Sequence, residues 1–181
     1  MKIGVMCSGN GTNFENIVTS CPEIEVVMMV YNKEDCGAVK RANSLGLPSC
    51  HIKSKDEDLI IRYFKGLDVD YIVLAGWMRI VSPKLINAFP RRIINIHPSL
   101  LPKYKGLNAV EQALDSGDEV SGCTVHYVTE ELDSGEIIYQ SEVPIFEGDT
   151  VDSLQRAIQQ AEHQLLPLVT HSLLHQSKLQ Q

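Results

Sequence analysis

The sequence predicts one α/β domain, built on an open, twisted, mostly parallel sheet with helices on both faces. Three observations support this fold class. Short β-rich runs alternate with helical patterns along most of the chain. Most of these runs lack polar alternation, as strands covered on both faces do. The length of 181 residues suits a single domain over 1–181, and no internal repeat or low-complexity linker divides it.

The first part of the chain supplies the parallel strands of the expected sheet. Continuous apolar runs predict strands at 2–7, 24–31, 49–52, 71–74 and 93–97. Apolar residues at helical spacing predict helices at 13–20, 38–45, 56–67 and 109–115. Ser82 and Pro83 have the residue types of an N-cap and a first helical position, and they open a further short helix that reaches Ala88.

The pattern changes after residue 115. "SGCTVHYV" alternates apolar and polar residues, and "GEIIYQSEVPI" is a second strand-like stretch. Joined through the loop "TEELDSGE", the two predict an antiparallel hairpin at the sheet edge. A last helix begins at about 149–150 and carries apolar residues at helical spacing, namely Leu154, Ile158, Ala161 and Leu165. Pro167 is expected to kink this helix.

Composition limits the partners. The formal net charge of -7 argues against nucleic acid or an anionic membrane as the main partner and favours small-molecule substrates. The five cysteines are scattered without a C-x-x-C pair, so neither a disulfide framework nor a metal site is indicated. The longest apolar run, "YIVLAGWM", is far shorter than the roughly 20 residues that span a bilayer, and the start lacks a signal-peptide pattern. We expect a cytoplasmic protein, either a monomer or a homodimer, that binds neither nucleic acid nor membrane.

The first glycine-rich turn, "CSGNGTNF", lies where the first strand meets the first helix. Backbone N–H groups at such a turn point at a common spot with the helix dipole behind them, so an anion fits. A dinucleotide is disfavoured, because Phe14 occupies the place of the third fingerprint glycine and Asn32-Lys33 stands where an acid is needed. A phosphate monoester is the favoured ligand. The alternative is a turn in which Thr12 or Asn13 only caps the helix.

The stretch "INIHPSLLP" places two polar side chains at the end of a buried strand. Side chains at i and i+2 of a strand share a face, so Asn95 and His97 project together while Ile94 and Ile96 turn into the core. Pro98 ends the strand beside His97. An amide and an imidazole held side by side suit a carbonyl that becomes an oxyanion. The alternative is a hydrogen-bonded pair that only ties the strand to a loop.

A carboxylate is the third group that such a site needs. The loop "ELDSGEI" offers Asp133 at a hairpin tip that folds over the same sheet end. A carboxylate near His97 favours imidazolium and fixes the ring orientation. Asp in a tight turn is also common for purely local reasons, so the sequence leaves both interpretations of Asp133 open.

Five segments carry a resemblance in their order and spacing. They are "SGNGTN", "LAGWMRI", "NIHPSLLPKYKGL", "GCTVHYV" and "ELDSGEII", and together they cover essentially the whole chain. In these segments the chain resembles the phosphoribosylglycinamide formyltransferase family, which belongs to the folate-dependent formyltransferase superfamily. The element N-x-H-P-S-L-L-P is shared by the wider superfamily and specifies the chemistry, whereas the SGNG[ST]N turn narrows the match.

The resemblance implies a Rossmann-like formyltransferase fold and transfer of the formyl group of 10-formyltetrahydrofolate to the amine of glycinamide ribonucleotide in purine biosynthesis, without a metal. It implies that the catalytic residues are Asn95, His97 and Asp133. It places the ribonucleotide against Gly11, Thr12, Asn13, Gln159, Gln160, Ala161 and Glu162. It places the folate against Lys55, Met78, Arg79, Ile80, Val81, Asn95, Thr129, Glu130, Glu131, Leu132 and Asp133.

Two departures from the family pattern stand out. An Arg that many relatives carry ahead of the third helix is replaced here by a Lys, either Lys55 or Lys53. Lys is a point charge without the guanidinium fork, so a carboxylate or phosphate contact there is less directional. Where relatives often carry a His after "KGL", this chain has Asn108 and the apolar Val110, which puts a second imidazole in doubt.

The mechanism implied by the resemblance uses Asn95 and protonated His97 to stabilise a tetrahedral oxyanion, with Asp133 assisting proton transfer. Two enzymes with the same core remain alternatives, namely a formyltetrahydrofolate hydrolase and another formyltransferase that acts on an amino sugar or aminoacyl-tRNA. The acidic charge disfavours tRNA, and the phosphate turn disfavours hydrolysis. A different class of protein, a nucleotide-binding module in which Asn95 and His97 are structural, remains open as well.

Overall fold

The computed structural model describes residues 1–179. One sheet runs through the molecule, and its strands are β1 (Lys2–Cys7), β2 (Glu25–Tyr31), β3 (Ser49–His51), β4 (Tyr71–Leu74), β5 (Ile93–His97), β6 (Val120–Tyr127) and β7 (Ile137–Pro144). Their spatial order is β3-β2-β1-β4-β5-β6-β7. The pairs from β3 to β5 are parallel, whereas β6 and β7 are antiparallel to their neighbours. The predicted mostly parallel sheet with an antiparallel hairpin at one edge is confirmed.

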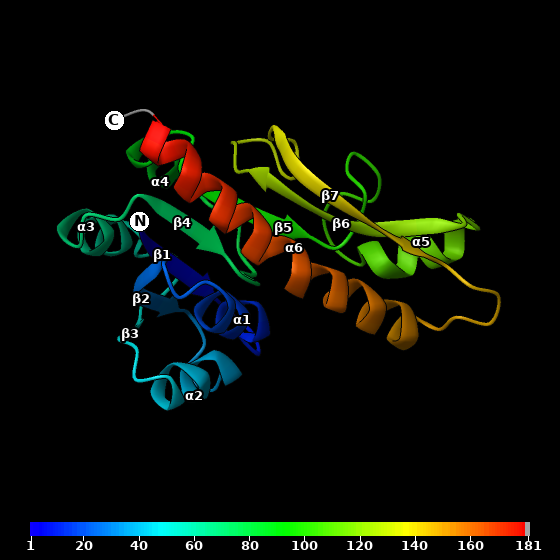
Figure 1. Ribbon diagram of the computed structural model, residues 1–181, viewed down its shortest axis with the longest axis horizontal. Coiled ribbons are helices and arrows are strands. Elements are labelled where there is room, and N and C mark those ends of the chain that lie inside the picture. Colours follow the sequence, from blue (N-terminus) through cyan, green and yellow to red (C-terminus); the bar gives the residue numbers. More distant parts are fainter. Residues whose placement is uncertain (180–181) are drawn as a thin grey trace.

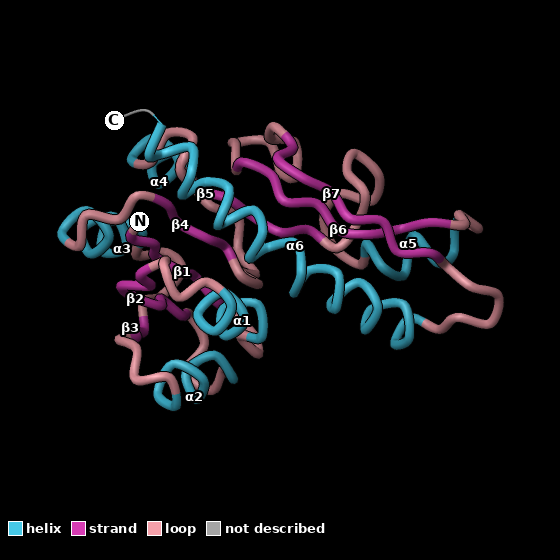
Figure 2. The backbone as a smooth tube through the Cα atoms, in the orientation of Figure 1, coloured by secondary structure: helices cyan, strands magenta, loops and turns pink. Residues whose placement is uncertain are grey.

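Helices cover both faces of the sheet (Figure 1). They are α1 (Thr12–Ser20), α2 (Gly37–Ser44), α3 (Glu57–Gly66), α4 (Pro83–Ala88), α5 (Ala109–Ser116) and α6 (Val151–Leu179). Helices and strands alternate as far as β5, and Figure 2 shows the paired strands of the hairpin following α5. Predicted boundaries agree with these bounds to within two residues, and Ser82 caps α4 as expected, its hydroxyl accepting from Leu85 N–H.

Two apolar clusters fill the two faces of the sheet. On one face, α1, α2, α5 and α6 pack over the strands, with Phe14 and Ile158 among the buried side chains. On the other face, α3 and α4 contribute Ile60, Phe64 and Leu85. The continuous apolar strands are explained by this arrangement, because a strand covered on both faces has no wet side.

The strand order reverses between β1 and β4. From β1 the chain builds outward through β2 and β3, then returns to build β4 and β5 on the other side. Because all these strands run parallel, the connections after β1 and β4 leave the same sheet edge and diverge, which opens a crevice there. A backbone hydrogen bond joins the segments that follow β1 and β4 at this crevice, because Ser8 N–H donates to Gly76 O at 2.9 Å.

The last helix, α6, runs along one face of the molecule and contacts α1, β6 and β7 (Figure 1). It continues across Pro167 as one helix. Within the described part of the chain, every helix is too short or too polar to cross a membrane.

Gly4 of β1 lets α3 approach the sheet closely. A Cβ at this position would lie 2.3 Å from Phe64 Cε1, far inside van der Waals contact. We predict that Gly4→Ala lowers the melting temperature by about 5 °C or more, because overpacking of a core costs about 1–3 kcal/mol. Gly66→Ala is the matched control, since a Cβ there meets no atom within 4 Å. Thermal unfolding followed by circular dichroism measures both, and equal effects at the two positions would contradict the packing argument.

Candidate active site

Two cavities adjoin at the carboxyl edge of the parallel strands, where the strand order reverses. The larger has a volume of about 910 Å³ and the smaller about 410 Å³. They share a wall made of Gly76, Met78, Ile96 and Pro98. The smaller cavity is bounded by the turn after β1 and by α6, and the larger by the loops after β4, β5 and β6. Two ligands bound there would meet along the shared wall.

The turn after β1 leaves helix N–H groups unused. Gly11 is the N-cap residue of α1, with a left-handed φ of 77°, and no side chain caps this end. The first N–H groups of a helix have no partner within the helix. They therefore face the smaller cavity, which Gly11, Thr12 and Asn13 line. The alternative in which Thr12 or Asn13 caps the helix is wrong, because Gly11 takes that place.

Gly11 is also required by packing. A Cβ at this residue would lie 2.7 Å from Cα and Cβ of Ala38 in α2. A positive φ is unfavourable for residues with a side chain. The close approach of α2 and the left-handed backbone conformation together require glycine at position 11.

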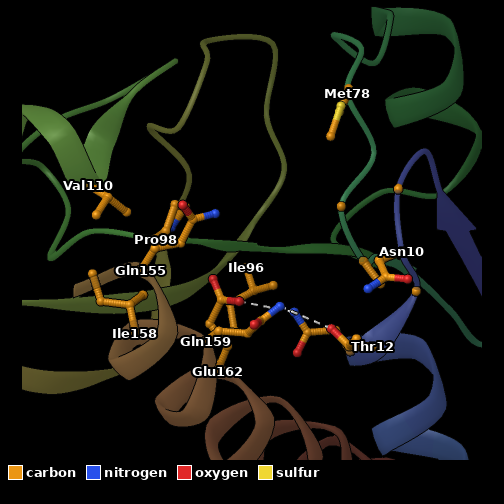
Figure 3. Close-up of a pocket in the computed structure, with 15 residues that line it drawn as sticks. Asn10, Thr12, Met78, Ile96, Pro98, Val110, Gln155, Ile158, Gln159 and Glu162 are labelled. Atoms are coloured by element: carbon orange, nitrogen blue, oxygen red, sulfur yellow. Dashed lines mark hydrogen bonds between the residues drawn. The ribbon is translucent and has the colours of Figure 1, made fainter. Parts of the chain in front are cut away.

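The opposite wall of the smaller cavity comes from α6 (Figure 3). Asn13 Nδ2 donates to Glu162 at 3.2 Å, and Gln159 Nε2 donates to Thr12 Oγ1 at 3.3 Å. The Oδ1 atom of Asn13 is buried and has no hydrogen-bond partner among the described residues. Burial raises the pKa of Glu162 to about 7, against the opposing hydrogen bond from Asn13. The cavity therefore combines an uncapped helix start, an unpaired acceptor and a carboxyl group whose pKa is raised to about 7.

The catalytic candidates converge at the larger cavity. Asn95, His97 and Asp133 all line it. The Nδ1 atom of His97 lies 3.4 Å from Asp133 Oδ2, and the His97 Nε2 atom lies 2.8 Å from the Tyr104 carbonyl oxygen. A carbonyl oxygen only accepts, so Nε2 carries a hydrogen. Both nitrogens of the buried His97 ring thus face oxygen acceptors, an arrangement that a doubly protonated ring satisfies.

His126 is a fourth polar residue at this site, and sequence reasoning missed it. Its Nδ1–H donates to Tyr127 O at 2.9 Å, and Asn95 Nδ2 donates to its Nε2 at 3.2 Å. Burial lowers the pKa of His126, which keeps the ring neutral so that Nε2 accepts. His126 therefore orients the Asn95 amide, leaving the second N–H of Asn95 for the cavity. The alternation in "TVHYV" predicts on which face of the strand His126 lies. Only the pairing with β5 shows that this face meets Asn95.

The loop that carries Asp133 is held tightly. Asp133 has a φ of 48°, which is uncommon outside glycine but tolerated by Asp. Its Oδ2 accepts from Gly106 N–H at 2.8 Å, and its Oδ1 lies 3.7 Å from His126 Nε2. The distance of 3.7 Å from Oδ1 to His126 is longer than a hydrogen bond, so Oδ1 can accept from a ligand or a water. Gly135 is required nearby, because a Cβ there would lie 1.6 Å from Tyr127 O.

The structure brings most of the predicted ligand residues to these cavities. The larger is lined by Met78, Arg79, Ile80, Val81, Asn95, Thr129, Glu130, Glu131, Leu132 and Asp133. The smaller is lined by Gly11, Thr12, Asn13, Gln159 and Glu162. Lys53, Lys55, Gln160 and Ala161 line neither. Lys53 and Lys55 are exposed side chains in the segment before α3.

Several cavity residues were not predicted as ligand contacts. Gly9 and Asn10 extend the lining contributed by the glycine-rich turn, Gln155 precedes Gln159 by one helical turn, and Trp77 and Leu107 add to the larger cavity. Gly9 and Asn10 lay inside the glycine-rich motif and were accessible to the same argument as Gly11. The exposure of Leu107, at 86%, is visible only in the structure.

The sequence matches the formyl transferase family over residues 1–170. The chain belongs to this family. It is 40% identical over 179 residues to a phosphoribosylglycinamide formyltransferase of Haemophilus influenzae, covering 93% of this chain and 84% of that protein. It is 39% identical to the Bacillus subtilis protein of the same name, covering 96% and 94%. A trifunctional purine biosynthetic protein of Chironomus tentans is 42% identical, and the match covers 13% of its length.

Solved structures of such formyltransferases have the same fold. The enzyme of Bacillus halodurans superposes with a TM-score of 0.91 at 39% identity, covering 96% of this chain and 95% of that one. The enzyme of Anaplasma phagocytophilum gives a TM-score of 0.92 at 39% identity, covering 94% and 85%. The resemblance drawn from the five sequence segments is confirmed, and the chain is a one-carbon group transferase.

The polar groups of the site suit organic ligands. In the described part of the chain, no three His, Cys, Asp or Glu residues are grouped as metal ligands. The larger cavity instead combines apolar side chains such as Ile80 and Leu132 with the Asn95–His97–Asp133 group. Cavities of this composition are typical of sites that bury most of a small molecule's surface.

Burial of Glu162 predicts a pH dependence of stability. The pKa of about 7 in the folded state exceeds the value of 4.5 of a free glutamate. Between these two values the folded state binds more protons than the unfolded state, so the free energy of unfolding falls as pH rises. The shift corresponds to about 3 kcal/mol between about pH 4 and pH 8. Glu162→Gln, which keeps an acceptor for Asn13, should flatten this fall in urea unfolding curves.

The matched control for that measurement is Glu147→Gln, the same change on an exposed residue. It should leave the pH dependence of the wild type in place. A Glu162→Gln variant whose stability follows the wild-type pH curve would show that Glu162 ionises as it does in the unfolded chain.

Proposed function

We propose that this protein transfers the formyl group of 10-formyltetrahydrofolate to the amine of glycinamide ribonucleotide, a reaction of purine biosynthesis. The observation that supports it most directly is the pair of adjoining cavities, which meet beside Asn95, His97 and Asp133. The names of the curated relatives point to the same acceptor. We further propose that these three residues carry the chemistry.

The smaller cavity is the proposed ribonucleotide site. A phosphate there accepts from N–H groups at the start of α1, with the helix dipole behind them. Neither Lys, Arg nor His is among the described residues that line this cavity. The phosphate is thus bound without a cationic side chain from this lining, and the unpaired Asn13 Oδ1 and the Glu162 carboxyl are placed to accept from hydroxyl or amine groups of the same ligand.

The larger cavity is the proposed folate site. Met78, Ile80 and Leu132 are exposed by 62%, 73% and 50%, an amount of apolar surface that a flat aromatic ligand would cover. Arg79, placed beside them, is a cation that can pair with a ligand carboxylate. Lys55 would contact only a part of the ligand that extends beyond the cavity.

The reaction needs one oxyanion and one proton transfer. The acceptor amine attacks the formyl carbon, a C–N bond forms, and the bond from that carbon to the folate nitrogen breaks. The free N–H of Asn95 donates to the formyl oxygen as its negative charge grows, and a protonated His97, held between Asp133 and the Tyr104 carbonyl, stabilises the same charge electrostatically. Asp133 Oδ1 accepts the proton that the amine loses, either directly or through a water. The leaving folate nitrogen then receives this proton.

Turnover should require the ribonucleotide. In this proposal the nucleophile is an amine tethered to the phosphate site, so 10-formyltetrahydrofolate alone should react at a rate near background. Absorbance at the folate band, with and without glycinamide ribonucleotide, measures this. Rapid release of formate without the ribonucleotide would reassign the enzyme as a formyltetrahydrofolate hydrolase, and turnover with another amine alone would make it a different formyltransferase.

Asp133→Asn tests the catalytic role of the carboxylate. Asn keeps an acceptor for Gly106 N–H but removes the charge that faces His97. We expect kcat to fall by about 10²- to 10⁴-fold while folate binding persists. Ser134→Ala is the control within the same loop and should keep kcat within about threefold of wild type. Retention of more than about a third of kcat by Asp133→Asn would leave Asp133 as a turn residue only.

A further inference from the structure

Pro167 lies inside α6, where a helix normally needs an N–H. In an α-helix each N–H donates to the carbonyl four residues earlier. Proline has no N–H, and its ring crowds that carbonyl. The carbonyl without its helical partner in α6 is that of His163. A freed carbonyl inside a packed helix is costly unless another donor reaches it.

Asn16 of α1 supplies this donor. Its Nδ2 donates to the His163 carbonyl oxygen. A second contact lies next to it, because Cys21 Sγ donates to Pro167 O at 3.6 Å. The helix therefore continues across Pro167 at the place where the Asn16 side chain replaces the missing N–H donor to the His163 carbonyl.

The same helix contact forms one wall of the smaller cavity. Asn16 to His163 joins two other polar contacts between α1 and α6, namely Thr12 to Gln159 and Asn13 to Glu162. Those two contacts involve residues that line the cavity, whereas Asn16 and His163 lie behind it. One helical turn separates Asn16 from Thr12 and Asn13, and His163 directly follows Glu162. A rotation or slide of α6 on α1 would therefore move Glu162 and Gln159 relative to the anion-binding turn.

We propose that Asn16 is a positioning residue for the acceptor site. Its bond to the carbonyl that Pro167 frees fixes the register of α6 on α1, and this register holds Glu162 and Gln159 against Thr12 and Asn13. Asn16 touches no ligand in this proposal and acts only through α6. The identity of the ligand rests on the proposed function, whereas the coupling between Asn16 and Pro167 does not.

A double-mutant cycle tests the coupling. Asn16→Ala leaves the His163 carbonyl without a donor, and we expect the melting temperature to fall by about 2–8 °C. Pro167→Ala restores the helical N–H, so in that background Asn16→Ala should lose less than half as much. The gain in helix propensity from Asn to Ala is present in both backgrounds and cancels. Thr19→Ala is the control, because the Thr19 hydroxyl bonds only within α1.

Kinetics of the same variants test the positioning. Asn16→Ala should raise the KM for glycinamide ribonucleotide by about fivefold or more, with kcat and the KM for the folate within about twofold of wild type. The double variant Asn16→Ala/Pro167→Ala should return this KM to within about twofold of Pro167→Ala alone. A purely structural bond would lower the melting temperature and leave the KM unchanged.

A readout without substrate separates this proposal from the proposed function. Displacement of α6 would expose Glu162, so Asn16→Ala should flatten the pH dependence of stability that Glu162→Gln removes. Additive melting temperatures in the cycle overturn the role of Asn16 as partner of the freed carbonyl. Coupled melting temperatures with an unchanged pH dependence overturn the positioning role. Absence of turnover with glycinamide ribonucleotide overturns the proposed function, and the cycle and the pH dependence then still decide on Asn16.

Discussion

The antiparallel register between β5 and β6 is the constraint on which the site depends. It sets Asn95 directly opposite His126 and His97 directly opposite Thr124. A slip by one residue would turn every side chain of a strand to the other face, so the register alone decides whether the Asn95 amide meets an imidazole. Thr124 secures the chain beyond β5, since its hydroxyl donates to Ser99 O at 2.7 Å and accepts from Leu101 N–H at 3.1 Å.

The loop after β5 in turn completes the surroundings of His97. Held by Thr124, the chain folds back so that the Tyr104 carbonyl reaches His97 Nε2, and Gly106 N–H reaches Asp133. Gln140 of β7 reinforces this return by donating to Leu101 O at 2.8 Å and to Thr124 Oγ1 at 3.0 Å. The hairpin is therefore more than an edge addition to a parallel sheet. It supplies His126 and Asp133 and fixes the loop that orients the imidazole.

Sequence reasoning succeeded where the deciding signal was local. The period of two along a strand was enough to place Asn95 and His97 on one face, and Pro98 marked the strand end. The glycines of the first turn likewise marked the start of α1, where no side chain caps the helix. His126 was missed because its role depends on a partner 31 residues away, across a register that the sequence does not state. Glu162 looked like an ordinary helix acid, since nothing in its own helix reveals that Asn13 and burial surround it.

In the proposed reaction, each of the two cavities binds one of the two small molecules between which the formyl group moves. In that reaction the anionic phosphate is bound away from the reacting atoms, so its charge does not oppose the negative charge that grows on the formyl oxygen. The smaller cavity would offer this phosphate the N–H groups at the start of α1, and neither lysine nor arginine is among the described residues that line it. The larger cavity is lined by Asn95, His97 and Asp133 and shares the wall of Ile96 and Pro98 with the smaller one. Ligands bound in both cavities would meet near Asn95, His97 and Asp133, and in the proposed reaction proximity of the reactants contributes to the rate together with stabilisation of the oxyanion.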